Sequence, residues 1–130
     1  MPTQHQINAF RESLEQRFRQ VREDIRQALL RSDEQSYIEL AGRVHDVEEE
    51  SVADLLVDVS LADIDRHVEE IRDIDAALTR IATGSFGTCC DCGEAIELQR
   101  LEAYPTARRC RPCQATYEKR RPVPPHSTSL

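Results

Sequence analysis

Two cysteine pairs, Cys89/Cys92 and Cys110/Cys113, are the feature that most constrains how this chain can fold. Each pair has the form C-x2-C, and residues 93–109 separate the two pairs. This spacing is typical of a zinc site in which four thiolates surround one tetrahedral ion. A disulfide pair or a thioredoxin-like redox motif is the alternative interpretation. The repeated spacing favours one structural zinc over both.

The residues around the cysteine pairs support a metal-stabilised module. Gly87 precedes the first pair and Gly93 follows it directly, where a tight turn often requires a positive φ. In so small a module, metal binding supplies folding free energy that a hydrophobic core cannot. Cys90 fits the repeated pattern less well than its neighbours, and we interpret it as a free cysteine.

Composition limits the class of protein. The 130 residues are 5% aromatic, lack Trp and are 32% charged, which suits long exposed helices better than a thick core. The formal net charge of -7 argues against direct DNA binding, which needs lysine and arginine. The sequence contains no apolar stretch of signal-peptide or membrane-spanning character. Five cysteines without an export signal fit reduced thiols, so we expect a soluble, cytoplasmic protein.

Two apolar stripes with helical spacing precede the cysteines, and they predict a mainly α fold. The first stripe consists of Ile7, Phe10, Leu14, Phe18, Val21, Ile25 and Ala28/Leu29, and Ile38, Ala41 and Val44 extend it. The second consists of Val57, Leu61, Ile64, Val68, Ile71, Ile74, Leu78 and Ile81, with Gly84 as its stop. A turn within residues 42–48 would join them into a long antiparallel two-helix coiled coil. Arms of about 35 residues would make a rod of roughly 50 Å.

The chain is therefore expected to have three parts. Residues 1–84 form the helical hairpin, with its tip at about 43–51. Residues 85–121 form the four-cysteine module, with a short helix near 95–103 and a C-terminal helix over 114–121. The proline-rich residues 122–130 form a disordered tail.

The motifs within the cysteine module resemble one known family. They are G-S-F-G-T-C at residues 84–89, C-G at 92–93, R-L-E-A-Y-P-T-A at 100–107 and C-x-x-C-Q at 110–114. This combination resembles the four-cysteine zinc finger of the DksA/TraR family of bacterial transcription regulators. The resemblance implies a monomer that binds RNA polymerase rather than DNA. In that family the coiled coil enters the secondary channel, the zinc end stays outside, and initiation is modulated by promoter type.

The resemblance also implies particular contact residues. The family's tip pattern, D-x-x-D-x-A, corresponds here to Asp46, Glu49 and Ser51, so the second carboxylate is longer and the small residue carries a hydroxyl. Arg66 falls where the family carries an important arginine. Three basic positions of the family's ppGpp site read Asp73, Tyr104 and Gln114 here. A carboxylate beside a polyanion is unfavourable, which predicts weak or absent ppGpp synergy.

Other functions fit less of the sequence. A zinc-finger coiled-coil adaptor that binds another protein is one alternative. A thiol redox sensor using Cys90 is a second, and Arg108, Arg109 and Arg111 could lower thiol pKa values in it. We favour a role for these arginines in balancing the charge of a four-thiolate zinc centre. No Ser/His/Asp set or phosphate loop is present, and four thiolates saturate the ion, so we expect no enzyme activity.

Overall fold

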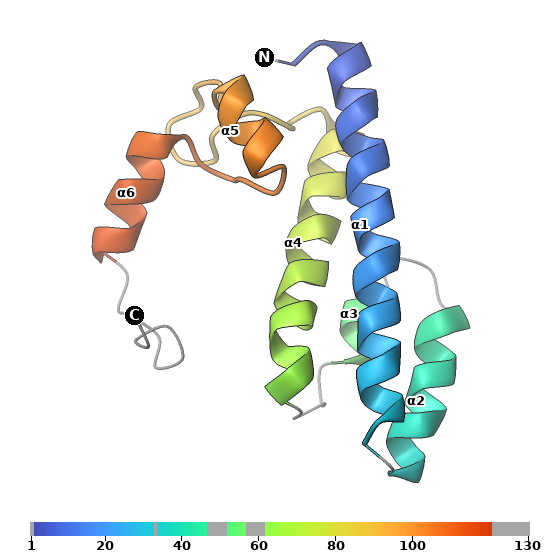
Figure 1. Cartoon of the computed structure of the whole chain (residues 1–130). Helices are drawn as coiled ribbons and strands as arrows, with labels where there is room; N and C mark the ends of the chain where they lie inside the picture. Colours follow the sequence, from blue (N-terminus) through green and yellow to red (C-terminus); the bar gives the residue numbers. More distant parts are fainter. Residues whose placement is uncertain (1, 33, 47–51, 57–61, 121–130) are drawn as a thin grey trace.

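The computed structural model describes residues 2–32, 34–46, 52–56 and 62–120. Its helices are α1 (Gln4–Leu30), α2 (Gln35–Asp46), α3 (Val52–Leu55), α4 (Ala62–Thr83), α5 (Leu98–Ala103) and α6 (Arg111–Arg120) (Figure 1). The described residues form no strand, and their one isolated β-bridge joins Thr88 to Ala95. The predicted mainly α fold with a small cysteine module is confirmed.

Helix α1 begins at a capping box and buries one continuous stripe. The Thr3 side chain accepts a hydrogen bond from the Gln6 backbone, and the Gln6 side chain accepts one from the Thr3 backbone. The stripe predicted from the sequence is buried at Leu14, Phe18, Val21, Ile25, Ala28 and Leu29. Its 27 residues make a helix of about 40 Å.

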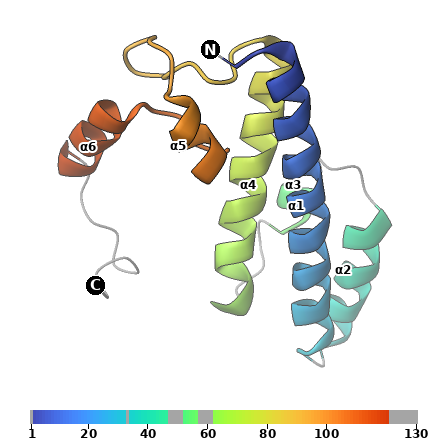
Figure 2. The ribbon, with the colours of Figure 1, turned by 45° about the horizontal axis from the view of Figure 1, so that its top comes forward.

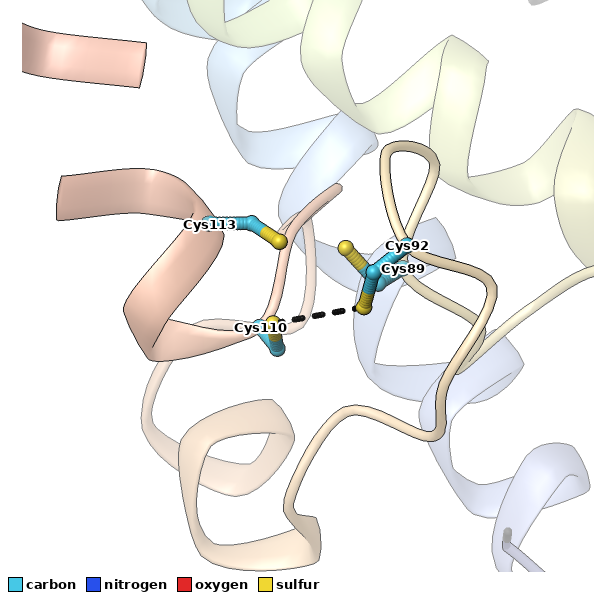
Figure 3. A group of neighbouring side chains, drawn as sticks. All are labelled: Cys89, Cys92, Cys110 and Cys113. Carbon is cyan, nitrogen blue, oxygen red and sulfur yellow. Dashed lines mark hydrogen bonds between the residues drawn. The ribbon is translucent and has the colours of Figure 1, made fainter. Parts of the chain in front are cut away.

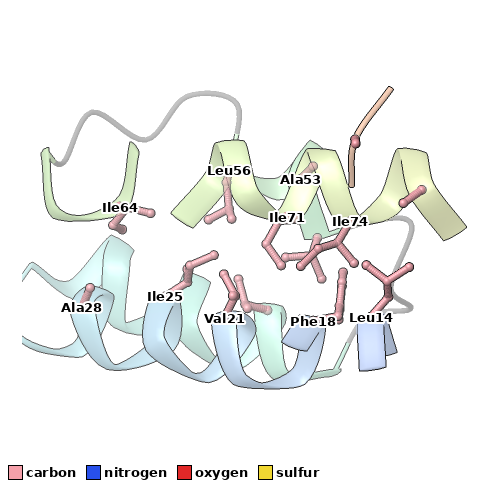
Figure 4. Close-up of a cluster of buried hydrophobic side chains, with 14 of the residues drawn as sticks. Leu14, Phe18, Val21, Ile25, Ala28, Ala53, Leu56, Ile64, Ile71 and Ile74 are labelled. Carbon is pink, nitrogen blue, oxygen red and sulfur yellow. The ribbon is translucent and has the colours of Figure 1, made fainter. Parts of the chain in front are cut away.

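Helix α4 runs antiparallel to α1 and packs along it (Figure 1). Its buried residues Ile64, Ile71 and Ile74 point toward the α1 stripe (Figure 4). The helix ends in a Schellman motif, in which Ser85 N–H donates to the Arg80 carbonyl at 2.9 Å and Gly84 has a φ of 83°. Gly84 is therefore the helix stop that the sequence predicted.

Helix α2 does not extend α1, and this part of the prediction is wrong. The chain reverses between the two helices, and α2 packs back against α1 with Ala41 and Val44 buried (Figure 1). The physical reason is helical phase. In one continuous helix of about 100° per residue, Ala41 and Val44 would lie more than roughly 100° away from the α1 stripe. The in-phase positions would be the polar residues Ser32, Ser36, Glu39 and Arg43.

The helical body is consequently a short bundle rather than a 50 Å rod. Helix α3, together with Leu56, packs its buried side chains against α4 and α2. The turn expected within residues 42–48 is helical as far as Asp46, and the remainder of that turn lies outside the described residues. The predicted tail, residues 122–130, also lies outside them.

The cysteine module sits beside the end of the body where α1 begins and α4 ends (Figures 1 and 2). Its buried apolar residues are Phe86, Ile96, Leu101 and Ala107. The rings of Phe86 and Phe10 meet at a centroid distance of 5.3 Å. Helix α5 matches the end of the short helix expected near 95–103. Helix α6 starts earlier than expected, at Arg111, and buries none of its residues.

None of the helices in the described part of the chain is both long and apolar enough to cross a membrane.

Candidate metal centre

The four predicted cysteines converge on one point (Figure 3). The sulfur atoms of Cys89, Cys92, Cys110 and Cys113 all lie within 4.8 Å of one another. The Cys92 and Cys110 sulfurs are 3.8 Å apart. A tetrahedral ion with Zn–S bonds of about 2.3 Å requires sulfurs separated by about 3.8 Å. The donor set and its spacing therefore fit one structural zinc, as predicted.

The first cysteine pair is shaped by a tight backbone turn. Cys89 N–H donates to the Glu94 carbonyl at 2.8 Å, and Gly93 N–H donates back to the Cys89 carbonyl at 3.0 Å. Gly93 has a φ of 77°, a conformation whose free energy is higher for a residue with a Cβ than for glycine. The turn thereby directs the Cys89 and Cys92 side chains to the same side.

The second pair is positioned by the start of α6. Cys110 precedes the helix, and its carbonyl accepts a hydrogen bond from Gln114 N–H at 2.9 Å. Cys113 lies in the first turn of the helix. Cys90 N–H donates to the Arg108 carbonyl at 2.9 Å, which joins the two halves of the module beside the sulfurs.

The environment of the sulfurs favours metal binding. Burial raises the pKa of the Cys89 thiol, but the backbone N–H groups of Cys92, Cys110 and Asp91 outweigh this effect and lower the pKa to about 6. Hydrogen bonds that the Cys113 thiol donates to the other three sulfurs, Cys110 foremost, stabilise its protonated form and raise the pKa of Cys113. The sulfurs are too close to ionise together without a cation, and a divalent metal supplies that charge.

The fifth cysteine lies outside this cluster. All five cysteines are free of disulfides, and Cys90 is exposed, with its sulfur 3.6 Å from Asp91 Oδ1. The disulfide alternative therefore finds no support in the structure. Cys90 lines an open cavity together with two of the ligands, Cys92 and Cys113.

Two of the arginines near the cysteines are held by other groups. Arg109 Nε donates to Asp91 Oδ2 at 2.7 Å, and its guanidinium lies 3.8 Å from the centre of the Tyr117 ring. Arg108 reaches Asp73 on α4, with a nitrogen–oxygen distance of 3.4 Å. Arg111 is exposed at the start of α6. Their role in balancing the charge of the centre remains a prediction.

The residues predicted to contact a partner are distributed over two regions. Asp46 is exposed at the end of α2, whereas Glu49 and Ser51 lie outside the described residues. Because α2 folds back along α1, the C-terminal end of α2 does not lie at the far end of the body (Figure 1). Arg66 is exposed on α4 and lines a cavity of about 510 Å³ between the body and the module.

The three residues that stand at the basic ppGpp positions of the family lie close together in the structure. Asp73, Tyr104 and Gln114 line one cavity of about 220 Å³. Six further residues line this cavity and were not predicted from the sequence; they are Arg100, Thr106, Ala107, Arg108, Arg109 and Tyr117. Their placement depends on how the module packs against α4, which cysteine spacing does not specify.

The geometry defines a zinc-finger protein of the four-thiolate type. Residues 84–119 match the family described as "Prokaryotic dksA/traR C4-type zinc finger". The chain belongs to the DksA/TraR family of zinc-finger proteins.

Curated relatives match about half of the chain. The "RNA polymerase-binding transcription factor DksA" of Haemophilus influenzae is 40% identical over 62 residues, which are 48% of this chain and 43% of that protein. The protein of the same name from Caulobacter vibrioides is 46% identical over 59 residues, which are 45% and 42% of the two chains. The chain thus spans less than half the length of these curated relatives.

A solved structure is also similar. It is the solution structure of the DnaK suppressor protein from Agrobacterium tumefaciens C58, which is 32% identical. The match covers 81% of this chain and 91% of that one, with a TM-score of 0.48.

Proposed function

We propose that this protein binds RNA polymerase and modulates transcription initiation, with zinc in a structural role. One observation carries the proposal: the four-thiolate centre lies within the segment that matches the family zinc finger. The names of the matched relatives describe binding to RNA polymerase. A rigid module fixed beside a helical pair is suited to hold a protein partner, because a preorganised surface loses little freedom on binding.

We further propose that the helical body approaches the secondary channel of the polymerase while the module stays outside. Asp46, Glu49 and Ser51 are the proposed contacts with the polymerase, and Arg66 is a further contact on α4. The net charge of -7 supports a protein partner over DNA. Domain boundaries at residues 84 and 121, and a monomeric state, are part of the same proposal.

A binding experiment with two matched cysteine variants tests the central proposal. Core RNA polymerase is captured by the tagged protein, and zinc is measured on the same sample. Cys113→Ser should lose zinc and polymerase together, whereas Cys90→Ser should retain both, because Cys90 is outside the cluster. A fully metal-loaded protein that fails to bind polymerase would refute the proposal and favour the adaptor alternative.

The contact residues need a separate assay. Asp46→Ala and Glu49→Ala should retain polymerase binding but lose most of the effect on initiation in vitro. Glu12→Ala is the control, because it removes an exposed carboxylate from the N-terminal half of α1, outside the proposed contact region. Competition with another secondary-channel protein tests the route of entry. Unchanged regulation by both variants would remove Asp46 and Glu49 from the proposal.

We also propose weak or absent synergy with ppGpp. Burial raises the pKa of Asp73, and Asp73 pairs with Arg108. The other two arginines of the cavity are engaged as well, since Arg109 pairs with Asp91 and Arg100 Nε donates to the Arg109 carbonyl at 2.9 Å. A polyanion would have to displace these contacts and approach a carboxylate.

In vitro transcription with and without ppGpp tests this point. The wild-type protein should respond little, and Asp73→Lys should increase the response because it replaces the carboxylate with a cation. Asp65→Lys makes the same charge change at an exposed position of α4 and is the control. Strong ppGpp synergy in the wild-type protein would contradict the proposal.

A further inference from the structure

The segment that leads into the first cysteine pair is in close contact with the chain's N-terminal residues. A Cβ placed on Gly87 would lie 2.9 Å from Cδ of Pro2 and 3.6 Å from Cδ1 of Leu101. Carbon atoms do not approach so closely without displacement, so only glycine leaves room for Pro2. Gly87 also has a φ of 85°, which favours glycine independently.

A second contact with the same segment is made by Phe10, which lies in α1. Phe10 and Phe86 pack with ring centroids 5.3 Å apart and an interplanar angle of 48°. Phe86 is only 2% exposed, and it precedes Gly87 directly. The N-terminal part of α1 is therefore held against residues 86–87 by an aromatic pair as well as by Pro2.

Residues 86–87 are in turn fixed by the first cysteine turn. The Gly87 carbonyl accepts a hydrogen bond from Ile96 N–H at 2.8 Å, and Thr88 and Ala95 form the isolated bridge. Cys89 N–H donates to the Glu94 carbonyl at 2.8 Å in the same short ladder. A metal bound by Cys89 and Cys92 closes this ladder at its end, so the orientation of residues 86–87 depends on the metal.

We propose that zinc occupancy controls the docking of residues 2–10 onto the module, and that these residues in turn raise the affinity for zinc. The two effects are one coupling free energy, since a contact that zinc strengthens must strengthen zinc binding by the same factor. Phe10 and Pro2 are positioning residues in this scheme, because they are not metal ligands and act through residues 86–87.

The coupling is local to the beginning of α1. From Phe18 onward the buried stripe of α1 lies along α4 and α2. Loss of zinc therefore releases residues 2–10 while the rest of the helix stays packed. Cys92 and Cys113 line an open cavity of about 530 Å³, so solvent and small chelators can reach the metal.

Zinc affinity, measured by competition with a chromophoric chelator, tests the coupling from the helix side. Phe10→Ala should raise the zinc dissociation constant about tenfold, a typical size for such coupling. Val21→Ala removes a buried side chain from the same helix at a position that faces α4, and it should leave the constant unchanged within about twofold. Equal effects of the two variants would overturn the proposal.

Hydrogen exchange on the full chain tests the coupling from the metal side. Stripping zinc should speed exchange of the Gln6 and Ile7 amides, while amides from Phe18 to Ile25 stay protected. Gly87→Ala should loosen the same N-terminal amides in the zinc-loaded protein, because its Cβ displaces Pro2. Gly84→Ala is the control, since it has a φ of 83° but no atom within 4 Å of its Cβ. Unchanged exchange at Gln6 and Ile7 on zinc removal would refute the coupling, and uniform exchange along α1 would refute its local character.

Discussion

The helical body and the zinc module use different sources of stability. In the body, the side chains of Phe18, Ile25, Leu29, Ile64 and Ile71 are fully buried along the contacts of α1 with its neighbours. In the module, Leu101 is the only large side chain among the described residues with no exposed surface, and α6 buries nothing. A module this small cannot build a sufficient core, so a metal crosslink takes its place. The comparison shows that one chain can depend on apolar area in one region and on coordination bonds in another.

Metal removal should separate the two regions most clearly. Structural zinc contributes on the order of 10 kcal/mol or more in small zinc-finger peptides at neutral pH. Treatment with a strong chelator should therefore unfold residues 85–120 while α1 and α4 stay paired beyond the first turns. NMR spectra of the same sample before and after chelation measure this directly. A module that keeps its dispersed resonances without metal would show that its few apolar contacts suffice.

Truncation of a core side chain should destabilise the helical body and leave the zinc module intact, the reverse of metal removal. Phe18→Ala removes a side chain of 0% exposure from the body and should cost about 3–5 kcal/mol in the free energy of unfolding. Zinc content should remain stoichiometric, because Phe18 is not a metal ligand and its side chain faces α4 (Figure 4). Leu30→Ala is the matched control at 36% exposure and should cost no more than about 0.5 kcal/mol. Loss of zinc from Phe18→Ala would mean that the regions fold as one unit.

The metal centre was predictable because its ligands are specified by short sequence motifs. Two C-x2-C motifs specify four ligands and one ion without any knowledge of the tertiary fold, and the sulfurs are found together. Gly84 and Gly93 were predictable for a similar reason, since positive φ at a helix end or a tight turn is a property of one residue. The composition of the cavity lined by Asp73, Tyr104 and Gln114 was not, because Arg100 and Tyr117 reach it only through packing of the module on α4.

The course of the helical body was only partly predictable. The stripe from Leu14 to Leu29 keeps its phase, and the helix is found there. Steps of three and four also seemed to continue through Ile38, Ala41 and Val44, but the polar stretch at residues 31–34 shifts the apolar face. Steps of three and four residues do not reveal that shift. It becomes visible when the position of each apolar residue around the helix axis is followed at about 100° per residue. The absence of Gly and Pro at residues 31–34 concealed the reversal further.

Backbone substitutions offer a finer comparison between helix ends and helix interiors. Gly84→Ala should destabilise the body by about 1 kcal/mol, because its φ of 83° strains a residue with a Cβ. Gly42→Ala should instead stabilise α2 by roughly 0.5–1 kcal/mol, since Gly42 is helical and its Cβ would meet nothing within 4 Å. Thermal unfolding of both variants checks these opposite signs. If Gly42→Ala destabilised the protein, α2 would not be helical in solution.

The smallest expected effect concerns the ion pair that links α1 to α4. Arg17 donates to both carboxylate oxygens of Glu70, with a distance of 2.9 Å from Nη2 to Oε1. The two side chains are 50% and 33% exposed, so solvent and salt screen the pair. A double-mutant cycle of Arg17→Ala and Glu70→Ala should give a coupling of about 0.2–1 kcal/mol, at the upper end because the geometry is bidentate. The coupling should fall as salt is raised, whereas the Phe18→Ala effect should not. A salt-independent coupling well above 1 kcal/mol would mean that charge, and not only apolar area, stabilises the helical body.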